Sequence, residues 1–249
     1  MKNLRFLIVL FAFAVLVFQS CSLNDSALEG SSGEGTGGSL ARFTIANNYL
    51  FTVDQTDLNV FDLSEAESPE LKIKKSVGFE PETIFPLGDR LFLGTTTGMS
   101  VYDISNPESP RQISFYDHVY SCDPVVSDGN YVYVTLNSNN TTCWRSVNEL
   151  HILDLENIES PELVKIYPMG GPQGLAIKND TLWVCDNGLK IFDVSDKSNI
   201  KELFHFTDVA ASDIILHENR ALVIGNNGFV QYRLIQNSIQ KISEIVVEN

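Results

Sequence analysis

A short apolar segment that ends in aspartate recurs along the chain and constrains its fold more than any other feature. Four copies and a degraded fifth are Val60-Phe61-Asp62-Leu63-Ser64, Val101-Tyr102-Asp103-Ile104-Ser105, Ile152-Leu153-Asp154-Leu155, Ile191-Phe192-Asp193-Val194-Ser195 and Gln231-Tyr232-Arg233-Leu234. The aspartates and the final arginine are separated by 41, 51, 39 and 40 residues. In the first three copies a Glu-Ser-Pro turn places proline seven residues after the aspartate. Two markers with one period indicate a true internal repeat.

Each repeat divides into four short strands. In the first repeat we expect strands at 42–46, 49–53, 59–63 and 71–76, with Asn47-Asn48 forming a type I′ hairpin turn. Four antiparallel strands every 40 or so residues, without an amphipathic helix between them, are typical of propeller blades. The sequence therefore predicts an all-β fold, a five-bladed β-propeller with four antiparallel strands per blade. The alternative is a β-sandwich or an open β-solenoid. The predicted repeats are 41–81, 82–121, 122–171, 172–210 and 211–249.

The first twenty residues are typical of a targeting signal. Lys2 and Arg5 precede an apolar run of 13 residues, Phe6–Phe18, which is shorter than the roughly 20 residues that a membrane-spanning helix needs. Phe18-Gln19-Ser20-Cys21 then resembles a lipobox, so we predict a signal peptide at 1–20 and lipidation, including palmitate, at Cys21. Residues 21–40 are rich in Gly and Ser and are predicted to be a tether to the propeller at 41–249. A soluble secreted protein and an uncleaved anchor are the alternatives.

The charge of the chain limits its partners. Its 249 residues include 17 Lys and Arg against 32 Asp and Glu, a formal net charge of −15. Nucleic acids require clustered cationic side chains, which this composition does not favour. An acidic surface also disfavours direct contact with anionic lipid. We therefore expect a monomer that contacts the membrane only through its N-terminal lipid.

The repeat resembles the LVIVD repeat found in β-propeller lipoproteins of bacterial envelopes. The resemblance covers residues 41–249 and is densest in four segments, Tyr120–Val126, Tyr131–Leu136, Pro172–Gly174 and Trp183–Asp186. It implies a propeller anchored by lipid to the outer membrane, and it leaves the periplasmic or outer face undetermined. It implies no common activity.

The repeated aspartates invite a catalytic or metal-binding interpretation. However, Asp62, Asp103, Asp154 and Asp193 each end a strand just before a turn. An aspartate in that position accepts backbone N–H groups as an Asx-turn. Because equivalent positions in different blades lie far apart, we interpret these residues as structural.

The cysteines divide into different predicted roles. Cys122 and Cys143 flank an insertion at 137–148 in the third repeat, and a disulfide between them is permitted outside the cytoplasm. Closing a loop of about 20 residues would stabilise the fold by roughly 3 kcal/mol. Two free thiols are the alternative. Cys185 follows Trp183-Val184 in a predicted second strand, so we expect a buried free thiol.

Polar residues occupy equivalent positions at the start of several first strands. These strands line the axial channel in a propeller, so the side chains should ring one mouth of it. They are Glu82, Asp123, Gln173 and Asp213. They form a candidate site for a sugar, and Glu82, Asp123 and Asp213 are weaker candidates for Ca²⁺. A solvated polar rim that binds nothing is the alternative.

No catalytic signature accompanies these features. None of the four histidines lies in a recognisable catalytic spacing, and the chain has neither a G-x-S-x-G segment nor a Gly-rich phosphate loop. We therefore expect a binding or scaffolding module for an envelope protein or glycan, without a cofactor. Trp144 and Arg145 belong to its predicted contact surface. The alternative is a calcium-dependent hydrolase or lactonase with Glu82, Asp123 and Asp213 at the channel mouth.

Overall fold

The computed structural model describes residues 37–78, 80–118, 124–137, 147–226, 228–235 and 238–247. Contacts divide the chain into two compact units, residues 1–31 and 32–249, and the described residues all belong to the second. Their secondary structure consists of twenty strands, and no helix among them could cross a membrane. Several predicted site residues lie outside the described residues, namely Cys21, Cys122, Asp123, Cys143, Trp144 and Arg145.

The strands form five separate sheets of four. Blade 1 contains β1 (Phe43–Ala46), β2 (Tyr49–Val53), β3 (Asp57–Asp62) and β4 (Glu70–Ser76). Blade 2 contains β5 (Pro81–Leu87), β6 (Arg90–Thr95), β7 (Gly98–Asp103) and β8 (Arg111–Asp117). Blade 3 contains β9 (Val125–Ser127), β10 (Tyr131–Asn137), β11 (Asn148–Asp154) and β12 (Glu162–Pro168). Blade 4 contains β13 (Pro172–Lys178), β14 (Thr181–Asp186), β15 (Leu189–Asp193) and β16 (Lys201–Phe206). Blade 5 contains β17 (Ala211–His217), β18 (Arg220–Gly225), β19 (Gly228–Ile235) and β20 (Ser238–Val246).

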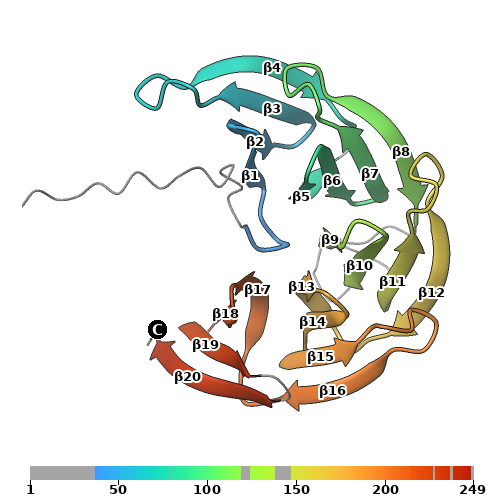
Figure 1. The fold of residues 1–249 in the computed structure, drawn as a ribbon, viewed down its shortest axis with the longest axis vertical. Helices are drawn as coiled ribbons and strands as arrows, with labels where there is room; N and C mark the ends of the chain where they lie inside the picture. The colour runs from blue at the N-terminus through green and yellow to red at the C-terminus, as the bar shows by residue number, and fades with distance from the viewer. Residues whose placement is uncertain are drawn as a thin grey trace, which may run out of the picture. The chain divides into compact units, whose positions relative to one another are not determined.

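Each sheet is an antiparallel meander whose strands pair in chain order. In Figure 1 the first strand of each sheet lies nearest the centre and the fourth lies at the periphery. The five sheets are arranged radially, which confirms the predicted five-bladed β-propeller.

The turns follow from the sequence of the repeat. Asn47 and Asn48 have φ angles of 51° and 64°, and two positive values are what the predicted type I′ turn requires. The strand-ending aspartates accept the backbone N–H two residues on, with N···Oδ1 distances of 2.8 Å for Asp62, 3.0 Å for Asp103, 2.7 Å for Asp154 and 2.9 Å for Asp193. The structural interpretation of the four aspartates is therefore confirmed.

Burial differs between inner and outer strands because a propeller blade packs on both of its faces. The second strands of blades 2, 3 and 4 are buried on both faces, and their sequences are accordingly near-continuous apolar runs, such as Leu91–Leu93. The fourth strands are largely exposed, as in β12. Four apolar clusters fill the contacts between blades 1 and 2, 2 and 3, 3 and 4, and 4 and 5.

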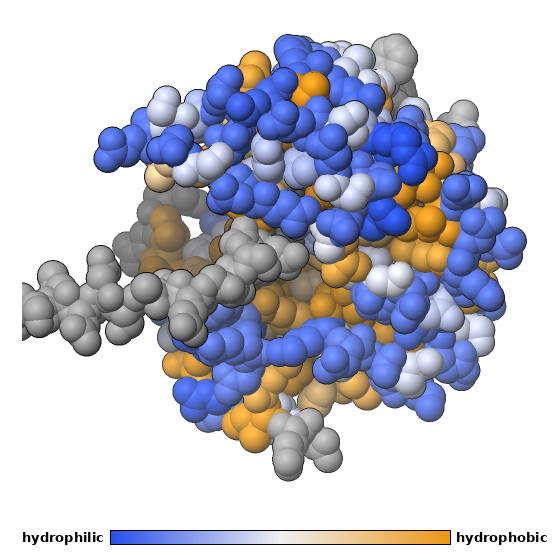
Figure 2. Space-filling model, turned by 45° about the horizontal axis from the view of Figure 1, so that its top comes forward, coloured by the Kyte–Doolittle hydropathy of each residue, from blue (hydrophilic) through white to orange (hydrophobic). Residues whose placement is uncertain are grey.

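The ends of the ring meet differently. Figure 1 shows the ribbons of blades 5 and 1 farther apart than those of the other neighbouring blades, and Figure 2 shows apolar residues among hydrophilic ones on the surface of the propeller. Ser39 and Leu40, the last residues of the predicted tether, lie within the propeller unit and contact Asp213 of blade 5. These two residues connect the two ends of the ring.

Candidate functional site

The channel mouth was the first predicted site, and the structure places its described residues on innermost strands. Glu82 lies on β5, Gln173 on β13 and Asp213 on β17. Glu82 is half-buried, Gln173 is exposed, and Asp213 is buried. The described residues contain no group of three His, Cys, Asp or Glu side chains that could hold a metal ion.

Asp213 already has partners within the chain. The Ser39 hydroxyl donates to Asp213 Oδ1 at 3.2 Å, and the Leu40 amide donates to Oδ2 at 3.3 Å. The Ser39 hydroxyl also accepts the Leu175 amide of blade 4 at 2.7 Å. Burial raises the pKa of Asp213 despite these hydrogen bonds. A Cβ at Gly38 would clash with the Asp213 carboxylate, so glycine allows the close approach. This arrangement, the Asp213 clip, holds the N-terminal segment against blades 4 and 5.

A second carboxylate, Asp186 at the end of β14, was not singled out from the sequence. It is fully buried and accepts hydrogen bonds from Lys190 Nζ at 2.7 Å and from the amides of Gly170 and Gly171 at 3.0 Å and 2.7 Å. Burial alone would raise its pKa, but these donors outweigh burial and lower it. The spacing of four residues between Asp186 and Lys190 was the available signal. The pair stabilises the inner end of blade 4.

A cluster of titratable side chains joins blades 2 and 3. His151 is buried on β11, with its Nδ1 3.2 Å from the Tyr116 hydroxyl and its Nε2 2.7 Å from Glu149 Oε2. The His118 ring lies edge-on, with its centroid 6.5 Å from that of His151. Glu149 and His151 alternate on one strand face, and this period-2 spacing was a signal that sequence reasoning missed. Burial lowers the pKa of His151. Because the imidazole is enclosed, the cluster acts as a polar contact between blades.

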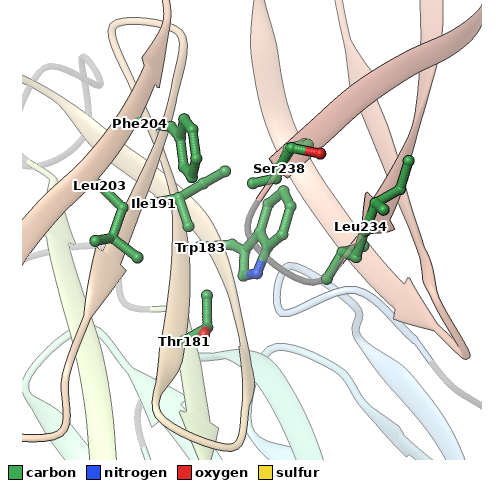
Figure 3. Close-up of a pocket in the computed structure, with 9 residues that line it drawn as sticks. Thr181, Trp183, Ile191, Leu203, Phe204, Leu234 and Ser238 are labelled. Atoms are coloured by element: carbon green, nitrogen blue, oxygen red, sulfur yellow. The ribbon is translucent and has the colours of Figure 1, made fainter.

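An apolar pocket of about 320 Å³ opens between blades 4 and 5. Figure 3 shows Trp183 at its centre, between Phe204 and Ile191 of blade 4 and Leu234 of blade 5. Leu203 and Ile235 are exposed residues of its lining, while Trp183 is fully buried. The pocket adjoins the apolar cluster between the two blades. We call it the Trp183 pocket.

The Trp183 pocket has the chemistry of a binding site for an apolar group. Its lining carries two hydroxyl side chains, Thr181 and Ser238, and no ionisable side chain. Among the residues that the structure describes, the buried Trp183 indole N–H has no hydrogen-bond partner, an arrangement that costs free energy. The pocket depends on how two blades meet, so no pattern within a single repeat points to it.

Comparisons with known proteins agree with this architecture. Residues 37–75 and 170–208 match the LVIVD repeat, and these segments correspond to blades 1 and 4. No curated protein sequence matches the chain.

Solved structures with similar folds share little sequence with the chain. A protein from Lactobacillus plantarum has a TM-score of 0.64 and 12% identity, over 80% of this chain and 68% of that one. A Bacteroides uniformis protein described as a candidate 6-phosphogluconolactonase has a TM-score of 0.62 and 11% identity, over 86% and 70%. A chain of the mitotic checkpoint complex has a TM-score of 0.60 and 11% identity, over 83% and 68%. The chain thus spans about two thirds of the length of these proteins.

At this level of identity the similarity concerns the fold alone. The chain is thus a five-bladed β-propeller in which two segments, in blades 1 and 4, match the LVIVD repeat.

Proposed function

We propose that this chain is a lipid-anchored β-propeller of the cell envelope that binds a protein partner. The observation that carries the binding role is the Trp183 pocket, an apolar opening on the molecular surface with exposed Leu203 and Ile235 in its lining. Exposed apolar surface around a pocket marks a contact site in a soluble domain. The pocket favours a protein over a glycan, because its walls offer few groups that hydrogen-bond to sugar hydroxyls.

The envelope location rests on the N-terminal signal and the lipobox-like segment that ends in Cys21. Several acyl chains on that cysteine would hold the protein at the outer membrane. We expect labelling with an acyl-chain probe in growing cells and recovery in the membrane fraction. Cys21→Ser should abolish both, and a membrane-bound, labelled Cys21→Ser protein would refute the anchor.

The pocket assignment can be tested with one substitution and a matched control. Leu203→Asp places a charge at the pocket, and the full-length lipidated protein should then lose at least one of the proteins that are chemically cross-linked to it in native membranes. Leu163→Asp alters another exposed leucine of a fourth strand, on blade 3, and should retain them. Equal cross-linking of both variants, with melting temperatures equal to the wild type, would show that the Trp183 pocket is not the contact site.

The calcium-dependent hydrolase alternative has weaker support. Its candidate Asp213 carboxylate already accepts hydrogen bonds from Ser39 and Leu40. Partner binding through the Trp144 and Arg145 surface is a further part of the proposal, and Trp144→Ala with Arg145→Ala should change the cross-linked proteins if that surface participates.

A further inference from the structure

Blade 1 presents a face that every other blade buries. The comparison concerns one position in each blade, the first-strand residue that pairs with the fourth residue of the second strand. In blades 2 to 5 this residue is Ile84, Val125, Leu175 and Ile214, with 2%, 0%, 0% and 1% of its surface exposed. In blade 1 it is Phe43, which is 62% exposed. The four aliphatic residues each pack against the preceding blade, so Phe43 faces a place where a preceding blade is missing.

Blade 5 shows the complementary feature. Ile224 is the fifth residue of the second strand β18. Its equivalents in blades 1, 3 and 4 are Val53, Thr135 and Cys185, which are 6%, 0% and 1% exposed. Val53 and Cys185 pack against the following blade. Ile224 is 52% exposed, and it pairs through Phe229 with Ile245, which is 62% exposed. Blade 5 therefore has an apolar face prepared for a following blade that the described chain does not supply.

The opening between these faces is held at its inner end. The Asp213 clip joins the segment before blade 1 to blade 5, and Arg42 donates to the Pro81 carbonyl at 3.0 Å, fixing blade 1 on blade 2. Figure 1 shows the ribbons of blade 5 and blade 1 farther apart than those of the other neighbouring blades, and exposed apolar side chains stand on both sides, Phe43 on blade 1 and Ile224 and Ile245 on blade 5. Blades 1 and 5 are thus connected near the centre of the propeller by the Asp213 clip and lie apart at its periphery.

We propose that this opening is a docking site for a protein partner that inserts one β-sheet of its own as a sixth blade. The inference rests on the proposed function, that the chain binds a protein. The inserted sheet must carry apolar side chains on both faces, because both walls are apolar, and it must be antiparallel with short strands to match the blades beside it. The existing contacts between blades, which bury the equivalent residues, indicate what covers such faces.

A second copy of this chain fits the opening less well. Each of its blades has another blade packed on at least one face. That attached blade would collide with blade 1 or blade 5 when its neighbour entered the opening. The fitting occupant is a sheet that stands free on both faces.

The width and chemistry of the opening can be tested by supplying the missing blade in cis. A duplicate of residues 172–206, which contains β13–β16, is joined by a flexible linker to the C-terminus of the full chain. Hydroxyl-radical labelling of Phe43 and Ile245 should then fall several-fold. The control extension carries Asp at the duplicated positions of Leu175 and Trp183 and should leave the labelling unchanged. Protection of Phe43 in the unextended monomer, or no protection by the duplicate, would overturn the proposal.

The natural occupant is identified by a photo-crosslinking amino acid at position 43 or 224 of the lipidated protein in native membranes. Both positions should label the same segment of one partner, and that segment, as a purified polypeptide, should protect both walls from labelling. Crosslinks to the opposite wall, to a second copy or to lipid would each refute an inserted sheet.

Two variants separate this proposal from the proposed function. Phe43→Asp should abolish crosslinking at position 224, whereas Leu203→Asp in the Trp183 pocket should retain it. If Phe43→Asp retains crosslinking at position 224 while Leu203→Asp loses other protein partners, the proposal of an inserted sixth blade is refuted and the proposed function stands. Loss of partners in neither variant would refute both.

Discussion

At the scale of single residues, the aspartates that end strands, Asp186 and Asp213 differ in their surroundings and therefore in their pKa values. Asp62 and its equivalents lie at strand ends, where hydrogen bonds from the serine two residues on lower the pKa of Asp62, Asp103 and Asp193. Asp186 is buried with a lowered pKa because charged and backbone donors surround it. Asp213 is buried with a raised pKa because burial dominates. The same side chain thus serves turns, a buried ion pair and the ring closure.

The lowered pKa of Asp186 predicts an acid-sensitive contribution to stability. The carboxylate has a lower pKa in the folded chain than the 3.8 of an unperturbed Asp, so its stabilisation is fully present above 3.8 and is lost as the pH falls from 3.8 through the lowered pKa of the folded chain. Asp186→Asn should lower the free energy of unfolding by about 2–3 kcal/mol at pH 7, and by less at pH 3.

Urea unfolding at the two pH values measures this difference. Asp180→Asn is a suitable control, because Asp180 is an exposed carboxylate paired with Lys197 at 3.2 Å and should contribute about 1 kcal/mol or less. An equal loss at pH 7 and pH 3 for Asp186→Asn would contradict the electrostatic explanation.

At the scale of strands and blades, the contacts between blades decide which side chains matter. The alternation of each strand sends one set of residues to the preceding blade and the other to the following blade. The cluster of His151, Tyr116 and Glu149 is the polar exception between blades 2 and 3, where apolar residues otherwise fill the contact.

This cluster predicts a second pH dependence. Burial holds the pKa of His151 below the ordinary 6.5, so the unfolded chain binds its proton more readily, and stability falls as the pH drops through 6.5. His151→Gln should flatten this part of the stability curve between pH 7 and pH 5, measured as the urea midpoint. His205→Gln, on an exposed strand of blade 4, should leave the slope as in the wild type. An unchanged slope in His151→Gln would contradict the assignment.

At the scale of the whole propeller, four apolar contacts hold five blades together and the Asp213 clip joins the ends. Asp213→Ala would leave the Ser39 hydroxyl and the Leu40 amide without their acceptor. Gly38→Ala would push the segment away from the carboxylate by steric clash. Gly38→Ala acts on the ring closure, and Asp213→Ala acts on the ring closure and on the close approach of Asp213 to Gly174 of blade 4.

We therefore expect Asp213→Ala and Gly38→Ala to lower the free energy of unfolding by about 2–3 kcal/mol and to enlarge the radius of gyration in small-angle scattering. Asp208→Ala, at an exposed neighbouring position, should change neither quantity. A wild-type radius of gyration in both clip variants would show that the ends are held by other contacts.

Prediction from the sequence succeeded where the interactions are local. The hairpin at Asn47-Asn48, the Asx-turns of the repeated aspartates and the buried free thiol of Cys185 follow from neighbours in the chain and are confirmed. The role of Asp213 was not predicted, because its partner Ser39 lies 174 residues away. The Trp183 pocket was not predicted for the same reason, since its walls come from two blades.

The sequence by itself determined the repeating unit of this protein, because a period of about 40 residues with four alternating strands favours units that bury their apolar faces by packing radially. Only the tertiary structure decided whether the first and last blades pack against each other. Phe43 and Ile224 resemble their buried equivalents in the sequence, and their exposure depends on where the last blade lies relative to the first. That relation is set by the accumulated rotation from blade to blade, which no single repeat encodes.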